Sequence, residues 1–169
     1  MIKSVFNYPI SQLFDIDASV IYAVPRYQRE YTWGKTQWED LFDDLLENDP
    51  GYFLGSMICI NQSADALSVQ ELEVVDGQQR LTTISLLFAG LYQSLKNVKS
   101  ELDEDQSIEL FNLKKKLVLK KIADKLRVTP QIQNHNLDDY RAILSEIGVI
   151  GSVHPEMAIF TDFGVGLKF

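Results

Sequence analysis

Cysteine and histidine are nearly absent from this sequence, which has one cysteine and two histidines among 169 residues. The one cysteine, Cys59, excludes an internal disulfide, and no set of Cys and His residues has the ligand spacing of a zinc site. We therefore expect neither zinc nor haem. Because Cys59 lies in the apolar run 53–60, we expect its thiol to be buried.

Long hydrophobic runs are also missing. No stretch approaches the roughly 18 apolar residues that a membrane-spanning helix needs. The first residues, MIKSVFNYPISQLF, lack the long apolar core behind a basic start that marks a secretory signal. We therefore predict a cytoplasmic protein with no membrane partner.

Positive charge is the third deficit. The chain has 16 Lys and Arg against 24 Asp and Glu, a formal net charge of -8. Non-specific binding to nucleic acid depends on Lys and Arg neutralising phosphates, so charge alone does not favour a DNA-gripping surface. The charge balance is still compatible with a local basic pocket for a small anion such as a nucleotide. Hydrophobic residues make up 46% of the chain and aromatic residues 11%, which predicts a globular domain with a core.

The spacing of apolar residues predicts strands and helices in alternation. Strands are expected at 20–24, 52–61, 70–75 and 126–129, with the buried second strand and the third strand as a candidate hairpin. Helices are expected at 36–47, 79–96, 101–125 and 136–147, after one short helical turn in 8–19. The helix 79–96 is expected to bury one apolar side, formed by Leu81, Ile84, Leu87, Phe88, Leu91 and Leu95.

The helix 36–47 carries the clearest pattern. Thr36 and Glu39 have the spacing of a capping box, in which each side chain satisfies a free amide at the helix start. Its apolar residues form a single stripe, opposite a side rich in Asp and Glu. The stripe consists of Trp38, Leu41, Phe42, Leu45 and Leu46. The acidic side is either a solvated surface or a face for a partner.

The segment 74–83, VVDGQQRLTT, places polar groups where a strand is predicted to turn into a helix. The first amides of such a helix point outward with partial positive charge and form a natural anion site. Gly77 permits a sharp turn, and Arg80 can grip a phosphate with two hydrogen bonds. Gln78 and Gln79 can bind a ligand or orient a water, and Asp76 can hold a metal, accept a proton or fix the arginine. In the alternative, Asp76 caps the helix, Gly77 makes the turn and Arg80 pairs with a surface acid.

The loop 25–33 has related chemistry. Arg26, Gln28 and Arg29 can hold phosphates, and Tyr27 can stack on a base. Because Gln28-Arg29 repeats the Gln79-Arg80 pair, the two segments are predicted to share a pocket. The alternative is a solvated loop that its aromatic residues anchor to the core. No phosphate loop of the G-x-x-x-x-G-K-[ST] type occurs in the chain.

Three segments together resemble one family. VPRYQREYTW (24–33), YFLGS (52–56) and VVDGQQRLTT (74–83) are similar to the signature segments of the domain of unknown function 262. This is the N-terminal domain of GmrSD-type, modification-dependent restriction endonucleases, and the resemblance runs from about residue 10 to residue 147. It implies an α/β (α+β) fold of the ParB/sulfiredoxin-like kind, with a small mixed sheet, flanking helices and a helical extension.

The resemblance also implies a site and an activity. DGQQR would form a nucleotide-phosphate site with Arg80, Gly77, Gln28, Arg29, Arg26 and Tyr27 as ligand-binding residues. Asp76, Gln78 and Gln79 would be catalytic, with Mg²⁺ held by Asp76 together with a nucleoside triphosphate. Hydrolysis would license DNA cleavage by an HNH-type nuclease domain or subunit, and modified DNA would be a partner only of the full system.

The chain divides into three parts on this interpretation: a nucleotide-binding domain (1–100), a helical extension with one short strand (101–148), and an incomplete or poorly ordered tail (149–169). Neither His135 nor His154 lies in an HNH-type motif, and both are expected in surface loops. Nuclease activity is therefore not expected of this chain alone. A non-catalytic sensor of a nucleotide or of modified DNA is the main alternative function, and a ParB-like nicking domain is a weaker one.

Overall fold

The computed structural model describes residues 4–63, 69–119 and 125–151. Its sheet has four strands in the order β2-β3-β1-β4. β1 (Val20–Ala23) is parallel to both of its neighbours, β3 (Gln70–Asp76) and β4 (Val128–Thr129), whereas β2 (Ile58–Asn61) is antiparallel to β3. The predicted hairpin and the α+β fold with a small mixed sheet are thus confirmed.

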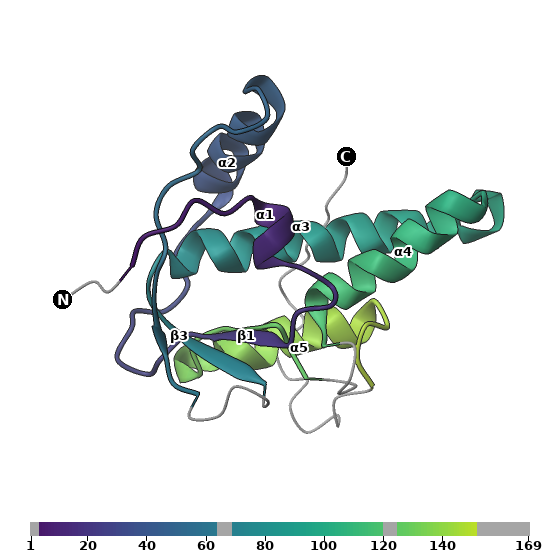
Figure 1. Cartoon of the computed structure of the whole chain (residues 1–169). Helices are drawn as coiled ribbons and strands as arrows, with labels where there is room; N and C mark the ends of the chain where they lie inside the picture. The colour runs from purple at the N-terminus through teal and green to yellow at the C-terminus, as the bar shows by residue number, and fades with distance from the viewer. Residues whose placement is uncertain (1–3, 64–68, 120–124, 152–169) are drawn as a thin grey trace.

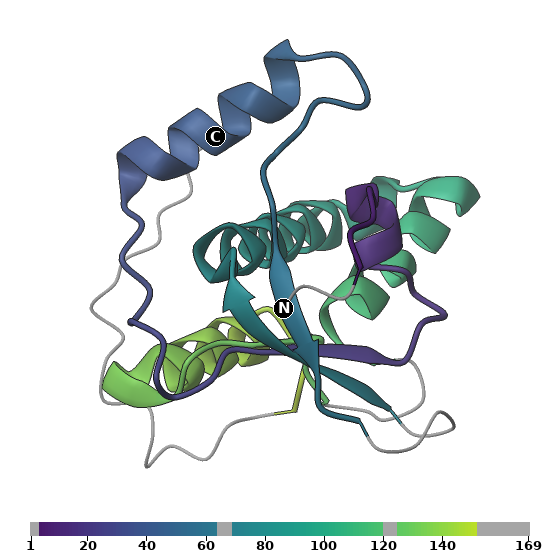
Figure 2. The ribbon, with the colours of Figure 1, turned by 60° about the vertical axis from the view of Figure 1, so that its left-hand side comes forward.

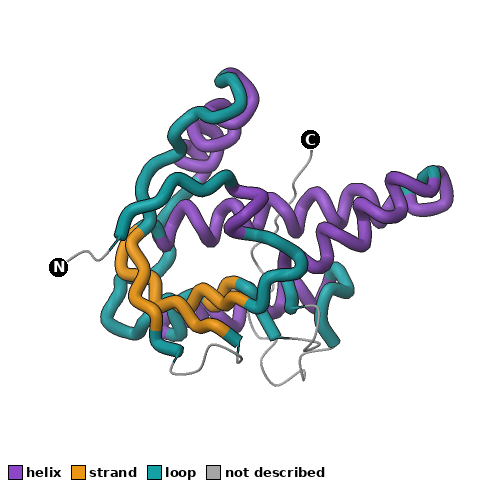
Figure 3. Tube along the Cα trace, viewed as in Figure 1, coloured by secondary structure: helices purple, strands orange, loops and turns teal. Residues whose placement is uncertain are grey.

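Five α-helices accompany the sheet in the described part of the chain. They are α1 (Ile10–Leu13), α2 (Lys35–Glu47), α3 (Gln78–Asn97), α4 (Glu104–Leu117) and α5 (Asn136–Glu146). Short 3-10 turns at Lys99–Glu101 and Gln133–His135 precede α4 and α5. Figure 3 shows the strands gathered at one side of the molecule, with α3 and α4 reaching beyond them. None of these helices is long and apolar enough to cross a membrane.

Two hydrophobic clusters meet along α3. Its first half covers one face of the sheet, where Leu81 and Ile84 pack with Tyr22, Val74 and Val128. Its second half packs with α4 and α5 in a cluster that includes Tyr92, Leu117 and Leu144. The hydroxyl groups of Ser85 and Tyr140 share a buried hydrogen bond of 2.5 Å between α3 and α5. α3 therefore belongs to both cores, and the division at residue 100 stays a prediction.

A capping box sets the start of α4 at Glu104, three residues after the predicted start at residue 101. Asp103 accepts a hydrogen bond from the Gln106 amide at 2.8 Å, and the Gln106 side chain accepts one from the Asp103 amide at 3.1 Å. Acidic residues fill the first turn and lysines the last, which suits the helix dipole. The helix ends at Leu117, so the predicted 101–125 helix is wrong at residues 118, 119 and 125, which are not helical. Residues 120–124 of that prediction lie outside the described residues.

The predicted capping box of α2 is wrong. The helix begins one residue earlier than Thr36, and the Gly34 amide donates to Gln37 Oε1 at 2.9 Å. Glu39 instead lies 3.5 Å from Lys35 as an exposed ion pair. Because Gly34 takes the N-cap position, the Thr36–Glu39 spacing falls two residues too late to serve the helix start.

The apolar stripe of α2 is largely exposed. Leu41 is its one buried member, while the exposed fraction of Leu46 is 68% and that of Trp38 is 42%. Figures 1 and 2 show α2 standing away from the sheet and from α3. The stripe therefore lacks a covering element within the described part of the chain.

The strand predicted at 52–61 is also shorter and more exposed than expected. It starts at Ile58, because Gly55 takes a left-handed conformation (φ +111°) that breaks the extended run. Phe53 is 72% exposed and Ile60 is 49% exposed, so the expectation of a buried strand is wrong. Cys59 is half-buried rather than buried, and desolvation raises the pKa of its thiol to about 11.

Two smaller expectations have mixed outcomes. Leu91, expected on the buried side of α3, is 53% exposed. His135 is exposed as predicted, and it accompanies Asn134 in the left-handed region before α5. In the tail Val149 is buried, whereas His154 and the rest of 152–169 lie outside the described residues.

Candidate functional site

The turn from β3 into α3 depends on Gly77. Its φ of +90° lies in the left-handed region, which side chains other than glycine rarely adopt. A Cβ at this position would lie 3.2 Å from the Ser56 carbonyl oxygen and 3.3 Å from Met57 Cα. Gly77 therefore permits both the turn and the close approach of Ser56 and Met57, which lead into β2.

The N-terminus of α3 has no side-chain cap. Gly77 occupies the N-cap position, and Asp76 Oδ1 accepts from the Gly77 amide at 2.8 Å instead of reaching an amide of the first turn. The helical ladder begins with the bond from the Leu81 amide to the Gly77 carbonyl at 3.0 Å. The alternative in which Asp76 caps the helix is therefore wrong, and the positive end of a 20-residue helix is left without a capping side chain.

Arg80 lies beside this helix start. Its Nη1 donates to the Ser56 carbonyl at 3.3 Å, and its guanidinium packs on the Gly55 backbone. A Cβ at Gly55 would lie 2.6 Å from Arg80 Cζ, so the glycine makes room for the guanidinium. Among the described residues no carboxylate forms an ion pair with Arg80. The alternative in which Arg80 pairs with a surface acid is therefore wrong for the described residues.

Gln78 and Gln79 join the turn to the loop 25–33. Both side chains are buried, and their amide nitrogens donate to the carbonyls of Arg29 (3.0 Å) and Glu30 (2.9 Å). Gln79 Oε1 also accepts from the Thr32 amide at 2.9 Å. The two segments that were predicted to share a pocket thus lie against each other. The catalytic role of the two glutamines stays a prediction, because in this arrangement their polar groups hold the loop.

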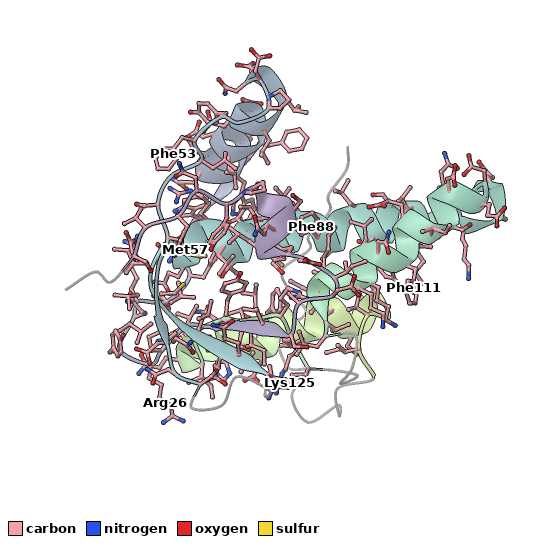
Figure 4. All side chains as sticks on the ribbon, viewed as in Figure 1. Arg26, Phe53, Met57, Phe88, Phe111 and Lys125 are labelled. Atoms are coloured by element: carbon pink, nitrogen blue, oxygen red, sulfur yellow. The ribbon has the colours of Figure 1, made fainter. Side chains whose placement is uncertain are left out.

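The remaining predicted ligand-binding residues lie further along the sheet. Gln28 Nε2 donates to the Val75 carbonyl at 2.6 Å, and the Tyr27 hydroxyl donates to Glu73 at 2.5 Å. Figure 4 shows the Arg26 side chain pointing away from the body of the protein. An open hollow next to it is lined by residues of the ends of β1 and β4, with Glu71 and Glu73 from β3. Arg26 and Tyr27 therefore gather at a different place from Arg80.

Three residues that the sequence analysis did not single out also hold the loop. Gln131 is 2% exposed and donates to the Gln28 carbonyl at 3.0 Å, and Asn134 donates to Glu30 Oε2 at 2.5 Å. Tyr31 stands between Trp38 Nε1, at 2.7 Å, and the Thr83 hydroxyl, at 2.6 Å. The contacts of Gln131 and Asn134 with the loop span about a hundred residues of sequence, so local sequence could not predict them. The polar segment QIQNH (131–135) was the one local feature that could have indicated these two residues.

The direction of the Tyr31 hydrogen bonds follows from chemistry. Thr83 Oγ1 donates to the Gln79 carbonyl at 2.8 Å, so it accepts from the Tyr31 hydroxyl, which in turn accepts from Trp38. Burial raises the pKa of Tyr31, while its hydrogen bonds with Thr83 and Trp38 lower it. The tyrosine is therefore a neutral link that ties α2 to the start of α3.

The acidic groups suit a shared metal rather than a metal held by protein alone. No group of three or more His, Cys, Asp or Glu side chains within the described ranges could hold a metal ion. Asp76 is exposed, and its Oδ1 is engaged with Gly77. Mg²⁺ commonly uses one or two carboxylates together with substrate phosphates, and a single exposed carboxylate beside an uncapped helix N-terminus fits that arrangement.

Comparison with known families agrees with the geometry. The family model "GmrSD restriction endonuclease, N-terminal domain" matches residues 10–151. The chain belongs to this family. No curated protein matches it. The segments 24–33, 52–56 and 74–83 lie inside the matched range, together with Gln131 and Asn134. The family connects the chain with a restriction system and its nuclease domain, while the likeness to ParB and sulfiredoxin stays a prediction.

Proposed function

We propose that this GmrSD N-terminal domain binds a nucleoside triphosphate with its phosphates at the start of α3. The observation that carries the proposal is the uncapped N-terminus of a long helix next to an arginine without an ion-pair partner among the described residues. Helix dipole, free amides and guanidinium all favour an anion there.

Each residue has a distinct task in this proposal. Arg80 and the first-turn amides bind phosphate oxygens, and Arg29 adds a second guanidinium from the loop that Gln78 fixes. Gly77 brings the backbone close to the ligand. Gln28 positions the loop rather than the nucleotide, because its amide is bonded to Val75. Arg26 and Tyr27 would contact only a ligand that extends toward the hollow at the ends of β1 and β4.

Asp76 is the residue that would hold Mg²⁺, with the remaining positions supplied by phosphates and water. The bound metal would neutralise phosphate charge during hydrolysis. In the full restriction system, hydrolysis would license cleavage of modified DNA by an HNH-type nuclease domain or subunit.

A second candidate function is a sensor that binds the nucleotide without turnover. The specific observation in its favour is that both glutamines predicted to be catalytic donate their side-chain amides to the loop backbone, and that Gln79 Oε1 also accepts from it. Such a module would pass the bound state to the nuclease through the loop and α2, which Tyr31 connects.

Calorimetric titration of the wild type and Arg80→Ala with GTP, ATP, CTP and UTP plus Mg²⁺ tests the proposal. Loss of the charged hydrogen bonds should weaken binding by about 10- to 100-fold. Arg141→Ala, which removes an exposed arginine on α5, is the matched control and should bind as the wild type does. Unchanged binding by a folded Arg80→Ala would refute the phosphate site.

A phosphate-release assay then separates the two functions. Release of inorganic phosphate that depends on Asp76 supports hydrolysis by this domain. Tight binding with release no faster than in the buffer blank supports the sensor.

A further inference from the structure

β2 forms one edge of the sheet, and β3 is its only hydrogen-bonded neighbour among the described strands. An edge strand presents alternate N–H and C=O groups that can pair with another strand. The other edge, β4, is two residues long and offers little to pair with. The register of the β2–β3 pair skips Val75, so the irregularity lies on β3 and leaves the outer side of β2 continuous.

Two usual protections of an edge strand, charged side chains and proline, are missing from β2. No charged residue occurs between Asp49 and Asp65, and Ile58–Asn61 contains no proline. Natural proteins commonly blunt such edges with lysine, proline or a covering segment. Ile58 and Ile60 are 39% and 49% exposed and point to the same face of the sheet.

We propose that β2 pairs antiparallel with β2 of a second copy of this chain, so that two four-stranded sheets become one. A twofold axis pairs a strand with itself, and each outward-facing backbone donor on one copy then meets an acceptor on the other. In the register centred on Cys59, Ile58 of each copy lies opposite Ile60 of the other. Cross-strand pairs of β-branched residues stabilise a sheet at such positions.

Charge permits a second copy at this uncharged edge and disfavours one at α2. Each chain carries a net charge of -8, so self-association requires a surface that is locally uncharged. The apolar stripe of α2 does not meet this requirement, since the helix has five acidic residues against one lysine. Two copies of α2 would repel each other. β2 is the uncharged alternative, and its hydrogen-bonding groups are complementary to themselves.

The pairing has a consequence for the segment that leads into β2. Ser56 accepts from Arg80, and Met57 lies close to Gly77. Figure 4 shows Met57 near the sheet and Phe53 outside, beside α2. A strand partner fixes β2 and thereby the segment that contacts Arg80. The dimer itself does not rest on the proposed nucleotide site.

Sedimentation equilibrium of the full chain tests the interface. The wild type should show the mass of two chains at high concentration. Ile60→Lys, which places like charges near each other across the twofold axis, should weaken the dimer by about tenfold or more. Ile108→Lys is the matched control, because Ile108 is 54% exposed on α4, and it should dimerise as the wild type does. Circular dichroism checks that each variant is folded.

Three results would overturn the proposal: a wild type that stays monomeric, a dimer that Ile60→Lys leaves intact, or a dimer that Leu46→Lys on α2 dissociates while Ile60→Lys does not. Hydrogen exchange of the wild type serves if Ile60→Lys fails to fold. The outward amides of β2 should become more protected as concentration rises, and equal protection in dilute and concentrated samples would contradict the pairing.

Discussion

The side-chain amide of Gln79 donates to the carbonyl oxygen of Glu30 at 2.9 Å, across 49 residues of sequence. This bond and its companion from Gln78 to Arg29 join the DGQQR turn to the loop that precedes α2. Neither glutamine is a surface residue, since their exposed fractions are 8% and 5%. Hydrogen bonds from two buried side chains therefore join the loop to the helix start.

Gln79→Glu should destabilise the protein. The substitution keeps the acceptor for the Thr32 amide and replaces the donor to the Glu30 carbonyl with a second oxygen. A buried carbonyl without its donor costs about 1–3 kcal/mol of unfolding free energy, which urea denaturation measures. Gln37→Glu is the control, because Gln37 acts only as an acceptor toward Gly34. Equal stability of Gln79→Glu and the wild type would contradict the assignment.

Gly77→Ala should cost about 1–3 kcal/mol in the same assay, because alanine is strained at a φ of +90°. The contact with the Ser56 carbonyl adds to this cost. Gly34→Ala provides the comparison: its N-cap φ is -112° and its nearest neighbour, Gln37 Oε1, is 3.7 Å away. If the two variants lose the same stability, the left-handed turn is not the reason for the glycine.

Arg127→Met should destabilise the protein, because it removes hydrogen bonds of a buried side chain that join three segments of the chain. Arg127 is fully buried, and its guanidinium donates to the carbonyls of Ala18, Val20 and Lys115 at 3.1, 3.4 and 3.2 Å. Methionine fills much of the volume and leaves these acceptors unpaired, at a cost of about 1–3 kcal/mol. Thermal and urea unfolding should show this loss. Arg141→Met, at an exposed position, should stay within about 0.5 kcal/mol of the wild type.

Cys59 should be slow to alkylate. Desolvation raises the pKa of its thiol from 9.0 to about 11, so the thiolate fraction at pH 8 falls roughly 100-fold below that of the unfolded chain. Because the unfolded thiol ionises first, the residue also lowers folding stability as pH rises from 9 toward 11. Iodoacetamide labelling of native and urea-unfolded protein at pH 8 measures the difference. Equal rates would show that the native thiol is solvated.

Local chemistry accounts for the elements that the sequence predicted well. α3 and α5 differ from their predicted ranges by one residue at each end or less, because their periodicity and the glycines near their ends act over a few residues. The run 52–61 was assigned to the interior from apolarity alone, and the equally apolar stripe of α2 is largely exposed. Burial needs a partner element, and no local signal states whether one is present.

The contacts of the candidate site were also only partly predictable from local sequence. The sequence predicted that the loop 25–33 and the DGQQR turn would share one place, and the structure brings them together. It did not indicate that Gln28 would bond to Val75, that Tyr27 would face Glu73, or that Gln131 would hold the loop from the C-terminal part. These bonds depend on the topology of the sheet, which places β4 beside β1.

The most direct test of the central claim is the change in backbone amide shifts when Mg²⁺ and a nucleoside triphosphate are added to isotope-labelled protein. The account predicts the largest shifts at the amides of Gln78, Gln79 and Arg80, with smaller shifts in the loop that the glutamines hold. A phosphate site at the start of α3 would be contradicted by shifts confined to Arg26, Glu71 and Thr129, which line the hollow at the ends of β1 and β4.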